Sequence, residues 1–81
     1  MSGEFTLDTA QEQSALKITR ITGSGSSRLR MLQMGITPGT RVEILRQAPL
    51  TDPVEILVRG TKLALRREEA KNINVVKAEG Q

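Results

Sequence analysis

Short segments in which apolar and polar side chains alternate make up most of the chain after residue 15. Alternation of this kind places one face of a β-strand in a core and the other in solvent. In the clearest case, Val54, Ile56 and Val58 share one face; the alternation over 16–22 breaks at Ile21, where we expect the strand to bulge or bend. The pattern predicts five strands, over residues 16–22, 41–46, 54–59, 62–66 and 73–77.

One segment has helical spacing instead. Residues 28–34 are good helix formers, and Leu29 and Leu32 lie three positions apart on one helix face. The serines of 23–27 can cap this helix, and Gly35 can adopt the positive φ that ends it. A single helical turn is predicted over 67–72, because acidic residues at its start interact favourably with a helix N-terminus.

Turn residues connect these elements. In residues 37–40, Pro38 fixes φ at the second position of a tight turn and Gly39 supplies a positive φ at the third. Gly60 and Thr61 suit a two-residue hairpin loop with Gly60 at its first central position. Prolines bracket the remaining loop, residues 48–53, and are expected to make it rigid.

Neither end of the chain has such a pattern. Residues 1–15 are polar and acidic and predict a flexible leader, and residues 78–81 predict a frayed tail. The single domain then covers residues 16–77. We expect a mainly β fold: a small SH3-like five-stranded barrel with a short α-helix after strand one and a helical turn before the last strand. An OB-like barrel is the second choice. Closure into a barrel is favoured because open strand edges promote aggregation.

Composition excludes most chemistry. The chain has no Cys and no His, which excludes disulfides, thiolate or imidazole metal centres, and catalysis by Cys–His or Ser–His sets. Phe5 is the single aromatic residue, so no platform for stacking nucleic-acid bases is expected. Asp52 and Glu55 are the only close acidic pair in the basic part of the chain, too few ligands for a metal site. We expect no cofactor, no metal and no enzymatic activity.

Charge is concentrated in the predicted domain. Residues 16–67 contain ten basic and three acidic side chains, a net charge of +7, whereas residues 1–15 carry −3. Such a segment favours an acidic protein surface or a polyanion as partner, although an ordinary solvated basic surface has the same composition. No apolar run reaches the ~18 residues of a membrane span.

Three sequence motifs distinguish this chain from a generic small β-barrel. They are residues 29–42 (LRMLQMGITPGTRV), residues 48–54 (APLTDPV) and residues 60–70 (GTKLALRREEA). In this order and spacing they resemble the FeoA family, and the resemblance covers residues 16–77. The family usually has Leu where this chain has Met34 and Gly where it has Thr51. Met34 keeps an apolar side chain at the helix end, and Thr51 stiffens the loop.

The resemblance implies a small cytoplasmic component of bacterial ferrous iron uptake, with an SH3-like barrel that acts through a protein partner. That partner would be FeoB, a membrane transporter with a cytoplasmic G-protein domain. The family's motifs place structural residues at Gly35, Pro38, Gly39, Pro53, Gly60, Leu65 and Arg66. We expect the docking surface to lie on the helix and the proline-bracketed loop, at Leu29, Arg30, Met34, Pro49, Leu50 and Asp52.

Alternatives stay open at this stage. Leu29 and Leu32 could both be core residues, which would leave only Arg30 and Gln33 of the helix exposed. Residues 34–42 also resemble the turn of AbrB-type DNA-binding proteins, and the same fold occurs as the C-terminal domain of DtxR-type repressors. A basic nucleic-acid-binding module is therefore the rival function. The sequence does not decide whether the barrel forms a weak homo-oligomer.

Overall fold

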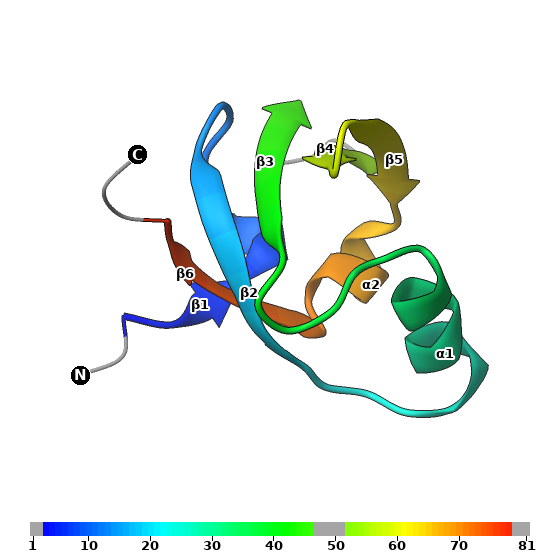
Figure 1. Cartoon of the computed structure of the whole chain (residues 1–81). Helices are drawn as coiled ribbons and strands as arrows, with labels where there is room; N and C mark the ends of the chain where they lie inside the picture. Colours follow the sequence, from blue (N-terminus) through cyan, green and yellow to red (C-terminus); the bar gives the residue numbers. More distant parts are fainter. Residues whose placement is uncertain (1–2, 47–51, 79–81) are drawn as a thin grey trace.

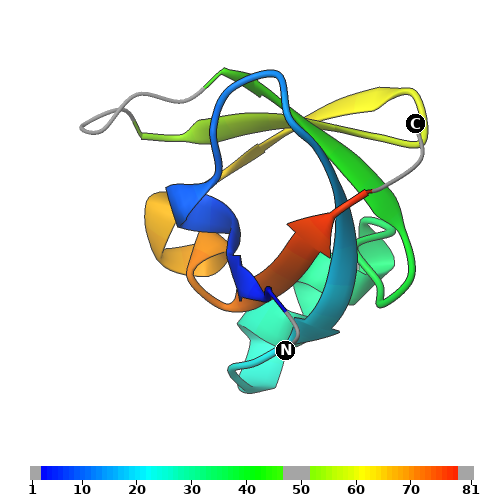
Figure 2. The same ribbon diagram turned by 90° about the vertical axis from the view of Figure 1, so that its left-hand side faces the viewer.

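The computed structural model describes residues 3–46 and 52–78, which form one curled antiparallel sheet with two short α-helices (Figure 1). The elements in chain order are β1 (Phe5–Thr6), the 3-10 helix η1 (Leu7–Thr9), β2 (Ala15–Ile21), α1 (Gly25–Gln33), β3 (Arg41–Arg46), β4 (Val54–Val58), β5 (Thr61–Leu65), α2 (Arg67–Ala70) and β6 (Ile73–Lys77). The sheet order is β1-β6-β2-β3-β4-β5. Figure 2 shows how these strands curve around a common core.

The inward faces of the strands supply that core. Val54 and Ile56 are fully buried and Val58 is 2% exposed, which confirms the predicted apolar face of this strand. The same alternation buries Leu16 and Ile18 on β2. β3 and β6 have the predicted bounds, and β2, β4 and β5 differ from the predicted strands by one residue at one or both ends. The mainly β, SH3-like fold class is confirmed.

β2 contains the predicted irregularity. Its register with β6 shifts between Ile18 and Arg20, so that Ile18 and Ile21 both reach the core although they are three positions apart. The hydroxyl of Thr19 donates to the carbonyl oxygen of Asn74 at 3.0 Å, which satisfies an acceptor at the bulge. The broken alternation in the sequence therefore indicated a real bend.

The first residues of the chain correct the prediction of a flexible leader over 1–15. Phe5 and Thr6 pair with Val75 and Asn74 of β6, and this contact adds a sixth strand to the five predicted. Leu7 is completely buried, and the carbonyl oxygen of Asp8 accepts a hydrogen bond of 2.9 Å from Nη1 of Arg67. A two-residue strand is too short to show a period in sequence, so these few apolar residues gave no signal.

The predicted frayed tail lies partly outside the described residues. Ala78 is half-buried, and its amide donates to the carbonyl oxygen of Ala15 at 3.0 Å, so Ala78 continues the contact between β6 and β2. No other residue of 78–81 is described.

α1 begins three residues before the predicted helix, and the side chain that it buries against the barrel is not one of the two leucines on the predicted face. Met31 is its buried residue, at 1% exposure, whereas Leu29 is 55% exposed and Leu32 is only half-buried. Ser24 at the N-cap makes no capping hydrogen bond through its side chain, contrary to the expected role of the serines. Gly35 ends the helix with φ of +89°, as predicted.

Both tight turns are present, and one has a different register. Gly39 has φ of +91°, and the amide of Thr40 donates to the carbonyl oxygen of Thr37 at 3.1 Å, as predicted. The hairpin between β4 and β5 is closed by the pair Val58 and Thr61, so its loop is Arg59–Gly60 and not Gly60–Thr61. Both loop residues have positive φ, 52° and 81°, as a type I′ turn requires.

α2 is the predicted single helical turn. It joins β5 to β6, and Ala70 on it is fully buried. Figure 1 shows α1 beyond α2, on the side of the barrel opposite to both chain ends. In the part of the chain that the structure describes, neither helix has the length and apolar character needed to cross a bilayer.

Candidate protein-docking surface

α1 presents one large apolar side chain to solvent. Leu29 is 55% exposed, and no other large apolar side chain within residues 3–46 and 52–78 is exposed to this degree. Because α1 contacts the barrel chiefly through Met31, the neighbouring turn of the helix is left uncovered. The alternative in which Leu29 is a core residue is therefore wrong. An exposed leucine with charged neighbours has the composition of an interface centre.

Arg30 connects this helix to α2. Its guanidinium forms an ion pair with the carboxylate of Glu69, and its Nη1 lies 3.6 Å from the sulfur of Met34. Met34 is half-buried and packs against the core, so it forms the inner border of the surface next to Arg30. Arg30 is thus held in place while about half of its side chain remains exposed.

The start of α2 receives a second contact from Asp52. Oδ1 of Asp52 accepts a hydrogen bond of 3.0 Å from the amide of Arg67, the first residue of α2. Its Oδ2 lies 3.9 Å from Nη1 of Arg66. A carboxylate at this place satisfies an unpaired amide and interacts favourably with the helix dipole. Asp52 therefore organises a helix fifteen residues further along the chain.

Glu69 joins the two contacts. Its Oε1 accepts a hydrogen bond of 3.1 Å from the amide of Arg66, and its other oxygen pairs with Arg30. Desolvation alone raises the pKa of Glu69, but the hydrogen bonds from Arg30 and from the Arg66 amide outweigh it and hold the pKa below its ordinary value of 4.5. The ionised carboxylate is therefore the form that this arrangement stabilises.

The lowered pKa of Glu69 makes part of the stability depend on pH. A depressed pKa in the folded state contributes stability above pH 4.5, and this contribution is lost as the pH falls through the folded-state pKa. At pH 7 we expect Glu69→Gln to lower the free energy of unfolding by about 0.5–1 kcal/mol, a typical value for an ion pair whose arginine is half exposed to solvent. Urea titrations at pH 3, 5 and 7 should show the two proteins converging at the lowest pH. An equal gap at all three values would contradict the role of the charge.

The structure brings together four of the six residues predicted for the docking surface. Leu29, Arg30 and Met34 lie on or at the end of α1, and Asp52 meets the same turn of α2 that Arg30 contacts. Pro49 and Leu50 lie outside the described residues. Pro53, Gly60 and Arg66 are exposed, whereas Leu65 is fully buried as part of the core.

Glu69 is the residue of this surface that the sequence did not single out. It lies 39 positions after Arg30, and no local pattern links the two. Its place among the acids at the start of a helix indicated a general helix-dipole role and not a specific partner. Within residues 3–46 and 52–78, Asp and Glu side chains form no cluster of three that could hold a metal ion.

The fold and this surface define the class of the protein. It is an SH3-like β-barrel with an inserted helix that exposes Leu29. The chain belongs to the FeoA family: the family model of the FeoA domain matches residues 5–77. This range includes β1 and η1, in agreement with their place in the fold.

Similar proteins agree with this assignment. An FeoA-like protein from Clostridium acetobutylicum is 32% identical, with a TM-score of 0.85 over all of this chain and 94% of its own. An Fe(2+) transport protein A/Fe(2+) transporter FeoB fusion protein from Porphyromonas gingivalis is 40% identical over 58 residues, 72% of this chain but only 7% of that protein. IdeR from T. acidophilum shares only the fold: it is 21% identical, with a TM-score of 0.82 over 93% of this chain and 34% of that one.

Proposed function

We propose that this protein is an accessory module of ferrous iron uptake that acts by binding FeoB on its cytoplasmic side. The observation that carries the proposal is the Porphyromonas relative, in which a region similar to this chain is fused to a FeoB transporter. When two modules are joined in one polypeptide, the linker keeps each at a high effective concentration near the other. Such a fusion is expected for modules that work by binding each other. The proposal assigns contact, and no catalytic step, to this chain.

The surface on α1 supports this proposal. Leu29 supplies an exposed apolar centre, and Arg30 supplies a charged group next to it in the helix. Asp52 and Arg66 add charged groups at the start of α2, the helix with which Arg30 forms its ion pair. Apolar centres surrounded by polar rims are typical of protein–protein interfaces, and a few central side chains provide most of the affinity. Arg30 is prepositioned by Glu69 and Met34, which reduces the entropy lost when it is fixed in a complex.

Titration of the labelled protein into full-length FeoB of the same organism, in nanodiscs, tests the proposal. The titration is run with GDP and with a non-hydrolysable GTP analogue at near-physiological salt, with duplex DNA as a parallel titrant. We expect saturable binding to FeoB in at least one nucleotide state and none to DNA. Absence of binding to FeoB in both states would contradict the proposal. Binding to DNA alone, weakening steeply with salt, would support the rival nucleic-acid module.

A further inference from the structure

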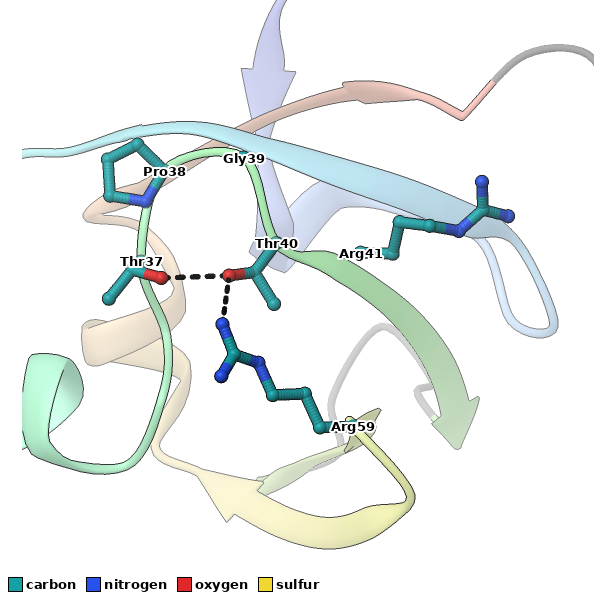
Figure 3. A pocket seen from close by; sticks show the side chains of 6 residues that line it. All are labelled: Thr37, Pro38, Gly39, Thr40, Arg41 and Arg59. Carbon is teal, nitrogen blue, oxygen red and sulfur yellow. Dashed lines mark hydrogen bonds between the residues drawn. The ribbon is translucent and has the colours of Figure 1, made fainter.

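A second feature lies beside the docking surface. An open pocket of about 460 Å³ lies between two loops. One is the turn that joins α1 to β3, and the other is the hairpin loop that joins β4 to β5. Its lining consists of Thr37, Pro38, Gly39, Thr40, Arg41 and Arg59, as Figure 3 shows. Among the residues that the structure describes, basic and hydroxyl side chains, Pro38 and Gly39 line this pocket, and no carboxylate does.

The hydroxyl groups and Arg59 form a connected set of hydrogen bonds. Nη2 of Arg59 donates to Oγ1 of Thr40 at 3.4 Å, and Oγ1 of Thr40 lies 2.8 Å from Oγ1 of Thr37 (Figure 3). Thr40 is only 7% exposed, so its hydroxyl forms part of the pocket floor. Among the described residues, no carboxylate forms an ion pair with Arg59, so most of its five N–H donors remain available.

The backbone at Arg59 is unusual for this side chain. Its φ of 52° lies in the left-handed region, where a type I′ turn favours Asn or Gly. Within the described chain, Gln13 is the one other non-glycine residue with positive φ. Strained backbone of this kind is concentrated at functional sites, because a functional side chain is kept there at some cost in stability. At this position the turn directs the guanidinium into the pocket (Figure 3).

The surroundings of the pocket also favour an anion. Lys17 pairs with Arg41 across β2 and β3, and Lys62 is exposed on β5 next to the hairpin. Glu43, two positions after Arg41, is the acidic residue of the adjoining smaller cavity, which Leu57, Arg41 and Arg59 also line. A nucleic acid carries phosphates along its whole length and would extend over this carboxylate, which makes it a less suitable ligand than a single carboxylate bound at Arg59.

We propose that the pocket formed by Thr37–Arg41 and Arg59 binds an acidic side chain of the protein partner, as a second contact beside α1. The inference rests on the proposed function, because it places this contact within the same complex. Because the pocket is open, it would cover only a small part of a free anion and would bind it weakly. The bound carboxylate therefore needs a partner chain that makes further contacts with this protein. Exposed Pro38 and half-buried Leu57 offer such apolar contacts nearby.

Distance along the chain makes a shared partner feasible. Thr37 follows Met34 by three residues, so their Cα atoms lie at most about 11 Å apart. A single partner segment can therefore touch the end of α1 and place a carboxylate at Arg59. Arginine is suited to this role because its planar guanidinium can bind both oxygens of a carboxylate.

The variant Arg59→Asn removes the guanidinium without disturbing the turn. Asn tolerates positive φ better than Arg, so we expect this variant to be at least as stable as the wild type. Lys62→Gln is the matched control, because it removes the same charge from an exposed neighbouring site that does not line the pocket.

The first experiment probes the pocket without FeoB. A blocked tri-glutamate peptide is titrated into ¹⁵N-labelled protein, with sodium chloride at equal ionic strength as reference. We expect amide shifts in Thr37, in residues 39–41 and in residues 59–60 for the wild type and Lys62→Gln, and none for Arg59→Asn. Equal shifts in Arg59→Asn, or no shifts beyond those from chloride, would overturn the proposal. So would stronger binding at these amides by inorganic phosphate, duplex DNA or anionic phospholipid vesicles.

The second experiment uses full-length FeoB in nanodiscs. We expect Arg59→Asn to weaken binding about tenfold or more, the effect of losing one charge-assisted contact, and Lys62→Gln to change it less than twofold. If FeoB binds but Arg59→Asn has no effect, or both variants weaken binding equally, the pocket proposal is wrong and the proposed function stands. If FeoB binds no form of the protein while the peptide still shifts the pocket amides, the proposed function is wrong and the pocket's affinity for carboxylates stands.

Discussion

Replacing Leu7 with alanine is expected to lower the free energy of unfolding by about 3 kcal/mol. Leu7 is fully buried in η1, which packs against α2 and β6, so truncation leaves a cavity that the short helix cannot fill. The total stability of a domain of this size is about 4–12 kcal/mol. One substitution in a segment that resembles a disordered leader would therefore remove a large part of the stability.

Urea denaturation followed by far-ultraviolet circular dichroism measures this effect. Gln11→Ala is the control, because Gln11 is exposed in the loop just after η1 and its truncation is expected to change stability by less than about 0.5 kcal/mol. Should the two variants denature at the same urea concentration, residues 5–10 would not be part of the cooperative fold. A loss of the order expected would establish that η1 belongs to the cooperative fold.

Replacing Leu29 with glutamate is expected to weaken binding to FeoB thirtyfold or more, equivalent to about 2 kcal/mol or above. The exposed leucine is the apolar centre of the proposed docking surface, and burying a charge there without a partner is unfavourable. Because the side chain is 55% exposed, the free energy of unfolding should change by less than about 0.5 kcal/mol. Binding and folding are thus separable at this position.

The matched control for this prediction is Gln11→Glu. It introduces the same negative charge at an exposed position in the loop between η1 and β2. This loop lies away from α1 in both views of the ribbon (Figures 1 and 2). Binding isotherms of the three proteins to full-length FeoB in nanodiscs give the comparison. Wild-type affinity in Leu29→Glu would exclude α1 as the docking surface, and an equal loss in Gln11→Glu would indicate a general electrostatic effect.

The strands were predictable from sequence because the alternation of apolar and polar residues in each one indicates which face is buried. Val54, Ile56 and Val58 alternate with polar or half-buried residues, and an alternation of this kind fixes both the strand and its inward face. Gly39 was equally informative, since few other residues adopt its positive φ. The hairpin at Gly60 was predicted in the wrong register because Arg59 occupies a left-handed position that sequence rules assign to Asn or Gly.

The docking surface was only partly predictable. The helix spacing suggested that Leu29 and Leu32 share a buried face, but a nine-residue helix lying on a barrel needs only one deeply buried side chain, and that is Met31. The bond from Arg67 to Asp52 spans fifteen residues, and the ion pair of Arg30 with Glu69 spans 39. Such contacts depend on how the sheet closes, which no local pattern encodes.

The pairing of β1 with β6 has a practical consequence for joining this domain to others. Phe5 lies opposite Val75 in an antiparallel pair, so Gly3 and Ala78, the ends of the described chain, emerge along the same margin of the sheet. That margin is on the other side of the barrel from α1 (Figure 1). A fluorophore, an affinity tag or a second polypeptide attached at either end would therefore leave Leu29 accessible. The barrel can be tethered from either terminus while its helix still faces outward.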